Sequence, residues 1–154
     1  MMRMLKSILA LAAVAVIVGQ VATEQRAAIE LRNQGLPLLS NSESAQVLVR
    51  ACGNCHSNRT DWPWYSHVAP VSWLVIEDVN DARRIMNFSE WGRLDVDRQR
   101  KKLQQMCDEV TDGAMPLGSY TPLHPGSKLT ADDVKTLCDW TNDERQRLDS
   151  SSAK

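Results

Sequence analysis

The sequence has no marked excess of charge of either sign, since 18 Lys and Arg stand against 19 Asp and Glu. A nearly neutral chain gives no indication of a polyanionic partner, so we expect no nucleic-acid binding. Four cysteines are too few for a small domain built on a framework of disulfides. Internal repeats and strand-like alternation of useful length are also missing, so the sequence predicts an all-α fold.

Phenylalanine and tyrosine are scarce, with one Phe and two Tyr, yet the chain contains five Trp. So many indoles in 154 residues indicate either a bulky apolar group to pack against or an unusual core. The length is that of one domain with appendages, and a hydrophobic content of 43% is enough for one modest core.

The N-terminus carries a long apolar run at residues 8–19, preceded by Arg3 and Lys6. A basic start before an apolar run is typical of an export signal or a membrane anchor. With its flanks the run approaches the ~20 residues that span a bilayer, and the residues after it form a poor cleavage site. We therefore expect residues 1–22 to be a signal anchor, or alternatively a cleaved signal peptide that leaves a soluble exported protein. Either outcome carries the rest of the chain out of the cytoplasm, to the periplasmic face of the inner membrane if anchored.

A helical domain is predicted at residues 41–148, after a linker at 23–40 and before a polar tail at 149–154. Ser40 and Glu43 form a capping-box pattern, which opens a helix that leads into a pair of cysteines. The side chains expected on the inner face of this helix are Val47, Leu48, Ala51, Cys52 and Cys55.

Three more stripes of apolar residues at helical spacing predict further helices, at about residues 70–86, 95–111 and 130–148. Gly113 is expected to stop the second of these, and a capping pattern at Thr130 opens the third. The side chains expected to face inward are Val71, Leu74, Val75 and Val79, then Val96, Leu103, Met106, Cys107 and Val110, then Val134, Leu137, Cys138 and Thr141.

The short motif C-G-N-C-H holds Cys52, Cys55 and His56 at the end of the first predicted helix. Haem attachment uses every element of this motif, because each thiol adds across one vinyl group and the adjacent imidazole becomes an axial ligand of the iron. Exported chains are where this attachment is made. The cofactor predicted is therefore one covalent haem c, with His56 bound to its iron.

Other chemistries of the motif need a different context. A structural zinc site would need four ligands, and Cys107 and Cys138 complete no usual finger spacing. A redox dithiol usually opens a helix after a strand. A plain disulfide between the two cysteines of the motif leaves its histidine unexplained.

A low-spin electron carrier needs a sixth ligand on the other side of the iron. Met115 lies in the open sequence G-A-M-P, where no helical stripe claims it for the core. His124, in P-L-H-P-G, is the alternative ligand, and His67 is a weaker one because it is close to the attachment point. An open sixth position is the remaining possibility.

Three stretches of the sequence, namely C-G-N-C-H-S-N-R-T-D-W-P-W-Y-S-H-V-A-P-V-S-W at residues 52–73, N-F-S-E-W and M-P-L-G-S-Y-T-P-L-H-P, resemble the bacterial haem-binding-domain family of small, often membrane-anchored c-type cytochromes. The likeness runs from about Val47 to Trp140. It implies haem bound covalently to two cysteines, a proximal histidine and a helical, cytochrome c-like body. It also keeps His124 as a ligand or a group in the haem pocket.

Aromatic side chains follow the motif at once, and we expect Trp62, Trp64, Tyr65 and Trp73 to pack on the haem, where they would exclude water. An ordinary aromatic core is the alternative. Arg59 is the nearest candidate to pair with a haem propionate.

Two further features leave alternatives open. The basic cluster of Arg98, Arg100, Lys101 and Lys102 fits a solvated helix face better than a docking patch for an acidic redox partner. Cys107 and Cys138 are expected either to form a disulfide or to stay as separate buried thiols.

The sequence as a whole predicts a monohaem c-type cytochrome that transfers single electrons, with redox partner proteins that the sequence does not identify. We expect an electron carrier rather than an enzyme, although the sequence does not decide the point. The alternatives are a haem-based sensor or ligand-binding module, and a small peroxidase-type enzyme with an open sixth position.

Overall fold

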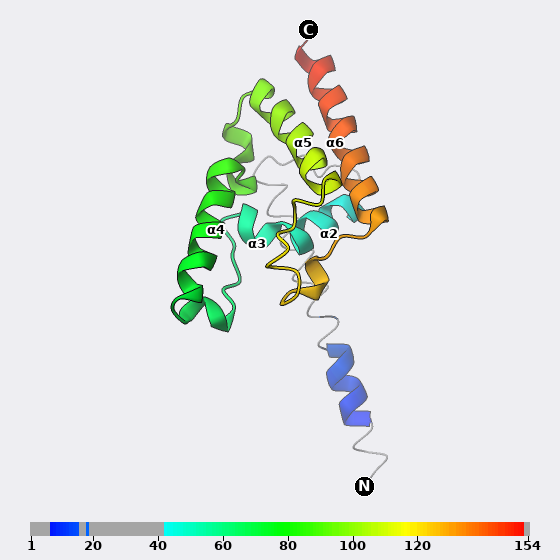
Figure 1. The fold of residues 1–154 in the computed structure, drawn as a ribbon. Coiled ribbons are helices and arrows are strands. Elements are labelled where there is room, and N and C mark those ends of the chain that lie inside the picture. The colour runs from blue at the N-terminus through cyan, green and yellow to red at the C-terminus, as the bar shows by residue number, and fades with distance from the viewer. Residues whose placement is uncertain (1–6, 16–17, 19–41, 153–154) are drawn as a thin grey trace.

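The computed structural model describes residues 7–15, 18 and 42–152 of the chain. The described part consists of helices, turns and loops without a β-strand, so the predicted all-α class is confirmed for it. Residues 7–15 form a helix. The elements that follow are α2 (Ser42–Ala51), α3 (Gly53–His56), η1 (Trp64–His67), α4 (Val71–Ile85), η2 (Phe88–Arg93), α5 (Val96–Thr111), η3 (Pro125–Ser127) and α6 (Ala131–Ser152) (Figure 1).

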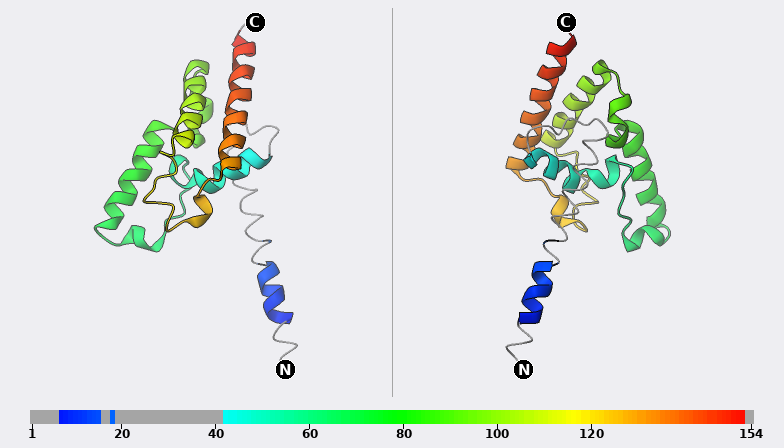
Figure 2. Two further views of the ribbon diagram at one scale, coloured as in Figure 1. Left: turned by 45° about the vertical axis from the view of Figure 1, so that its right-hand side comes forward. Right: turned by 180° about the vertical axis from the view of Figure 1, so that it is seen from behind.

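Helices α5 and α6 lie side by side at one end of the body, and α2 runs across the base of α6 (Figure 1). Both views in Figure 2 show α4 on the flank opposite α6. The core lies where α2, η2, α5 and α6 meet. Its fully buried side chains are Leu48, Phe88, Trp91, Leu103 and Leu137.

The predicted third helix is confirmed almost to the residue. Asp95 caps α5, since its carboxylate accepts a hydrogen bond of 2.8 Å from the backbone N–H of Arg98. Gly113 ends it with a φ of 70°, a left-handed conformation that glycine adopts without steric cost. The chain then turns into the loop that carries Met115.

The predicted inner face of the second helix is confirmed for two of its four side chains and wrong for the other two. Val79 is buried and Val75 is half-buried, but Val71 and Leu74 are exposed. The buried side chains of α4 are Val79 and Ala82 in its second half, whereas Val71 and Leu74 in its first turn are exposed. Val96 is 37% exposed, because it is the first residue of α5.

The N-terminal prediction falls mainly on residues that the structure does not describe. Within residues 7–15, 18 and 42–152, no helix has both the length and the apolar character needed to cross a bilayer. The expected linker at 23–40, and with it Ser40 of the capping box, lies outside the described residues. At the other end of the chain, α6 continues past Leu148 to Ser152.

A disulfide joins Cys107 of α5 to Cys138 of α6, which decides between the two states that the sequence left open. The bond closes a segment of the chain with a sequence separation of 31 residues. This segment contains the whole loop between α5 and α6, including Met115 and His124. The disulfide therefore restrains the ends of that loop.

Replacing both disulfide cysteines with serine (C107S/C138S) is expected to lower the free energy of unfolding by about 4 kcal/mol, the entropic cost of closing a segment of this length. Urea unfolding followed by circular dichroism measures the loss. Wild-type protein treated with reductant is the control and is expected to match the variant. Equal stabilities of oxidised and reduced wild type would contradict the disulfide.

An ion pair ties α2 to the start of α6. A guanidinium nitrogen of Arg50 lies 2.7 Å from a carboxylate oxygen of Asp133. The same carboxylate accepts hydrogen bonds from the backbone and hydroxyl of Thr130, and the Asp133 N–H donates back to that hydroxyl. The capping pattern predicted at Thr130 is therefore present.

These contacts make the stability of the fold depend on pH. Burial by itself raises the pKa of Asp133, but the hydrogen bonds from Thr130 and the charge of Arg50 outweigh burial and lower it. A carboxyl group with a lowered pKa stabilises the folded state above its unfolded pKa of about 3.9 and loses that contribution as the pH falls through its folded value.

D133N is therefore expected to cost about 1 kcal/mol at pH 7, and the difference from wild type is expected to shrink as the pH falls below about 3.9 and to be lost below the folded pKa of Asp133. Unfolding curves at several pH values measure it. D139N is the matched control, because Asp139 pairs with Lys135 on the exposed face of the same helix and such pairs contribute little. A D133N deficit that persists unchanged at low pH would contradict the assignment.

Candidate functional site

The C-G-N-C-H motif forms a helical turn of its own directly after α2. The Cys52 N–H donates to the carbonyl of Leu48 at 3.0 Å, and the His56 N–H donates to the carbonyl of Cys52 at 2.9 Å. Both Cys52 and Cys55 are free thiols and are half-buried. The turn thus presents two thiols one helical turn apart, followed by the imidazole.

The imidazole of His56 is buried and held from one side. Its Nδ1 atom lies 2.9 Å from the backbone oxygen of Met86, just after the end of α4. A carbonyl only accepts, so Nδ1 carries the proton and Nε2 keeps its lone pair. The ring packs on Phe88, with ring centroids 5.7 Å apart. Burial lowers the pKa of His56, and hydrogen bonds with the backbone at Met86 and Ala82 only partly oppose it, so the ring is neutral at pH 7.

The two thiols of the motif are protonated at neutral pH. Burial, with a contribution from Cys55, raises the pKa of Cys52 from 9.0 to about 12. Burial and the carboxylate of Asp78 raise the pKa of Cys55. Catalytic dithiols have a lowered pKa instead, because the thiolate is the reactive form. The electrostatics of the site therefore argue against a redox dithiol.

The loop after the motif is fastened to the motif and to α4. The Thr60 hydroxyl donates to the carbonyl of Asn54 at 2.6 Å, and the Ser57 hydroxyl donates to the carbonyl of Gly53 at 2.7 Å. Arg83 of α4 donates to the carbonyl of Ser57 at 2.9 Å and to the Thr60 hydroxyl at 2.8 Å. These bonds fix the direction in which the chain leaves His56.

A polar and aromatic cluster links the motif to the loop between α5 and α6. Asn54 of the motif donates to the Tyr120 hydroxyl at 3.1 Å, and the Tyr120 ring stacks on His124 with centroids 3.8 Å apart. His124 Nδ1 lies 3.1 Å from the Tyr120 carbonyl, so Nδ1 carries the proton. His124 Nε2 then accepts from the Tyr65 hydroxyl at 3.1 Å.

Sequence reasoning singled out Tyr65 and His124 in this cluster but not Asn54 or Tyr120. A signal for Tyr120 was available, since it precedes His124 by four residues within the stretch that carries the family resemblance. Asn54 occupies one of the two variable positions of the motif, where the residue type carries no information about attachment.

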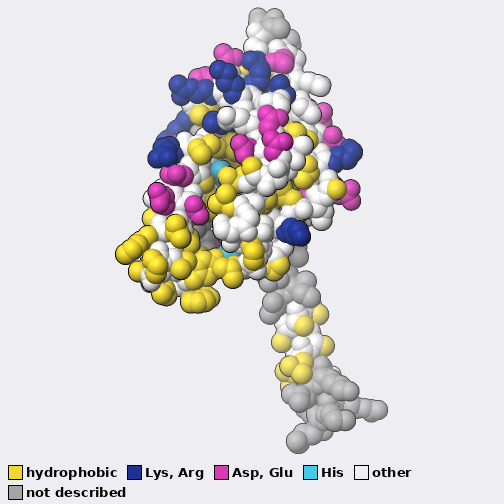
Figure 3. Space-filling view, viewed as in Figure 1, with side chains coloured by type: hydrophobic (Ala, Val, Ile, Leu, Met, Phe, Trp, Pro, Cys, Tyr) yellow, Lys and Arg dark blue, Asp and Glu magenta, His cyan; other side chains and the backbone are white. Residues whose placement is uncertain are grey.

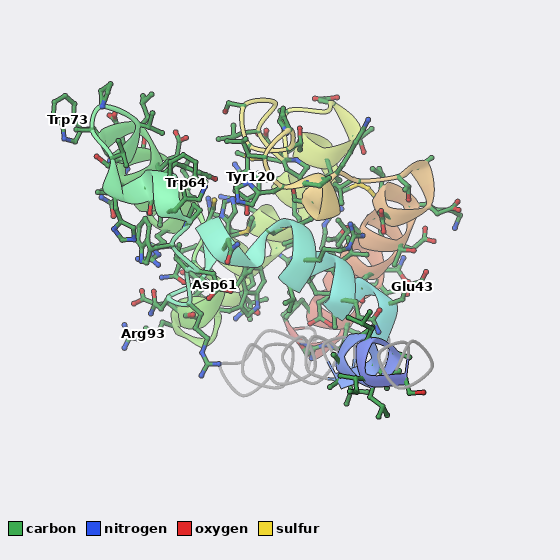
Figure 4. The ribbon with its side chains drawn as sticks, turned by 90° about the horizontal axis from the view of Figure 1, so that it is seen from below. Glu43, Asp61, Trp64, Trp73, Arg93 and Tyr120 are labelled. Carbon is green, nitrogen blue, oxygen red and sulfur yellow. A yellow bond between two sulfur atoms is a disulfide. The ribbon has the colours of Figure 1, made fainter. Side chains whose placement is uncertain are left out.

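The other predicted site residues lie in different settings. Met115 is half-buried against the core, and its N–H donates to the carbonyl of Glu109 at 3.1 Å. Trp64 is 79% exposed and packs edge-to-face on Tyr65. Trp62 is also exposed. In Figure 4, Trp64 lies nearer to Tyr120, and Trp73 stands at the outer edge of the molecule. His67 and Arg59 are exposed.

A four-ligand zinc site built from the cysteines is not possible here, because Cys107 and Cys138 are bonded to each other. Within the described residues, no group of three or more His, Cys, Asp and Glu side chains is arranged to hold a metal ion. The motif offers one imidazole, and the two cysteine sulfurs beside it are free to form covalent bonds.

Comparison with characterised proteins and with solved structures gave no match. A family model described as the haem-binding domain matches residues 12–143, which is well over half of the chain and includes the motif, α4, η2, α5 and the loop with Met115 and His124. The chain therefore belongs to the haem-binding-domain family.

Proposed function

We propose that this haem-binding protein carries one haem, bound through thioether bonds from Cys52 and Cys55, with His56 as the proximal iron ligand. The observation that carries the proposal is the hydrogen bond from His56 Nδ1 to the Met86 carbonyl, since it leaves Nε2 with a lone pair for a metal. Two free thiols on the same helical turn supply the sulfur atoms that covalent attachment needs.

A buried indole also fits a group with carboxylates. The Nε1–H of Trp91 is buried and has no hydrogen-bond partner among the described residues. Trp91 lies on η2, which packs against α3 and therefore against the motif. A buried donor without an acceptor is costly, and a haem propionate would supply one.

The function that we propose is one-electron transfer, without conversion of a substrate. Haem supplies an iron that accepts and returns a single electron. The residues of the chain orient the proximal imidazole through Met86 and keep it neutral by burial. Arg83 holds the loop after the motif, which keeps the approach to His56 fixed. The donor and acceptor would be other redox proteins.

Met115 is the sixth ligand that we propose, and His124 is the alternative. Both ring nitrogens of His124 are engaged, with Nδ1 donating to Tyr120 and Nε2 accepting from Tyr65. Binding iron through Nε2 would cost the bond to Tyr65. A thioether has no strong hydrogen bond to lose, and a Met ligand favours the ferrous state of the iron.

We further propose that the protein works outside the cytoplasm, anchored by residues 1–22 on the periplasmic face of the inner membrane, or soluble if that segment is cleaved. The disulfide between Cys107 and Cys138 supports export, because such bonds persist in oxidising compartments. The basic residues before the apolar run support the orientation.

The Tyr65–His124 pair favours a second candidate function. If the sixth position is open, a hydrogen-bonded histidine and tyrosine linked to the motif through Tyr120 and Asn54 could serve a ligand-binding sensor or a peroxidase-type enzyme as a polar or acid–base group.

Covalent attachment predicts that haem stays with the protein after acid–acetone extraction. The preparation is exported protein made with an active haem-maturation system, and the absorbance of the protein pellet is measured. C52S/C55S is expected to retain no haem after the extraction, because no thiol remains to bond a vinyl group. C107S/C138S is the matched control, since it also removes two cysteines, and it is expected to retain haem. Wild-type haem that passes fully into the acetone would overturn the proposal.

The sixth ligand is tested by optical spectra of the oxidised and reduced protein. Wild type is expected to be low-spin in both states and to show the red charge-transfer band of methionine bound to ferric haem. M115A is expected to lose this band and to bind carbon monoxide at once when reduced, whereas H124Q is expected to keep the band. Loss of the low-spin spectrum in H124Q but not in M115A would transfer the assignment to His124. A high-spin reduced wild type would favour the second candidate function.

A further inference from the structure

Exposed large apolar side chains are concentrated in two segments of the chain. Of the fifteen in the described part, five lie within residues 8–18 and seven within residues 62–76. Neither segment contains Asp, Glu, Lys or Arg. Single exposed apolar residues are ordinary, but charge-free clusters of them mark interaction surfaces. The second cluster belongs to the folded body, so we expect a binding partner to cover residues 62–76.

Residues 71–76 at the start of α4 are apolar on nearly every side, and Ser72 is the one polar residue among them. With 3.6 residues per turn, Val71 and Leu74 lie on one flank, and Trp73 and Ile76 lie on the nearly opposite flank. Val75 faces the body. A helix that is apolar all round is normally buried in something. Here Trp73 is 68% exposed and Leu74 is 63% exposed.

These residues form one end of the molecule. We call Val68, Val71, Trp73, Leu74 and Ile76 the apolar tip. In Figure 3 hydrophobic side chains gather at the lower end of α4 and the segment before it, while Lys and Arg gather at the opposite end of this face. Figure 4 shows Trp73 at the outer edge of the molecule.

A haem held by the motif would leave part of the apolar tip uncovered. Helix α4 reaches the motif through its second half, since Arg83 bonds to Ser57 and the residue after the helix, Met86, bonds to His56. The apolar tip belongs to the other end of this helix, and Trp73 stands at the outer edge of the molecule. Ile76 precedes Arg83 by seven residues, which is roughly 10 Å along the helix axis, and Trp73 lies almost a turn further away. They need a different partner.

We propose that the apolar tip inserts into the interfacial region of a lipid bilayer. Indole side chains are enriched at that level of the membrane, and a surface without charges loses no ionic hydration when it enters. Protein interfaces carry about one hydrogen bond per 100–200 Å², whereas Trp73 Nε1–H is the single polar side-chain group of the tip. The chemistry of the tip thus fits lipid better than a protein partner or a second copy of the chain.

The N-terminal anchor proposed above would hold the apolar tip within reach of a membrane, so this step rests on that proposal. Residues 18 and 42 are 24 residues apart, and a chain of this length spans at most roughly 86 Å when fully extended. An anchored body therefore stays close to the bilayer surface, where even weak apolar insertion is favoured by high effective concentration.

The full haem-loaded chain in phosphatidylcholine nanodiscs tests this inference. A small fraction of the lipid carries a photoactivatable diazirine, and labelled peptides are identified by mass spectrometry. Label is expected in the peptide with residues 62–76 as well as in the N-terminal run. W73Q/I76Q is expected to lower labelling of the tip at least about fivefold, because two apolar side chains no longer enter the bilayer.

I85Q/V96Q is the matched control, since it removes two exposed apolar side chains outside the tip, and it is expected to leave the labelling unchanged. High salt is also expected to change nothing, because the insertion is apolar. Circular dichroism confirms that each variant is folded. Label confined to the N-terminal run would overturn the inference, as would a dimer that W73Q/I76Q abolishes while the lipid label is absent.

The absorbance of the same samples reports haem independently of the lipid label. A preparation that labels at the tip but retains no covalent haem would overturn the proposed function and leave the membrane contact standing. A haem-loaded preparation without label at the tip would overturn the membrane contact and leave the proposed function standing.

Discussion

The site depends on one hydrogen bond, from Nδ1 of His56 to the backbone carbonyl of Met86. This bond selects the tautomer, fixes the ring plane and leaves Nε2 as the atom that can donate an electron pair. It also joins the motif turn to the end of α4, 30 residues further along the chain. Phe88 packs on the same ring, and burial keeps the imidazole neutral. The rest of the domain holds these two segments in register.

Local patterns in the sequence were sufficient for the features that local chemistry determines. The motif with Cys52, Cys55 and His56 can be recognised in the sequence alone. Its position after a helix follows from the spacing of the apolar residues that precede it. The start and end of α5 were predictable because Asp95 and Gly113 act on their immediate neighbours. The all-α class followed from the lack of strand-like alternation.

Features that depend on packing between distant segments could not be predicted. The acceptor for His56 is a backbone carbonyl, which every residue has, so the sequence does not mark Met86. Periodicity gave α4 an inner face but could not tell that its first turn, with Val71 and Leu74, is exposed. The pairing of Cys107 with Cys138 needed the distance between two helices, a Cα–Cα separation of 4.9 Å.

The most direct test of this account is nitrogen NMR of the reduced, haem-loaded protein with labelled histidine, recorded as the pH is varied. The three histidines are distinguished with H67Q and H124Q variants. The account predicts that His56 keeps a proton on Nδ1, does not titrate, and has its Nε2 signal shifted by bonding to iron. A His56 ring that titrates like free imidazole, or that carries its proton on Nε2, would contradict it.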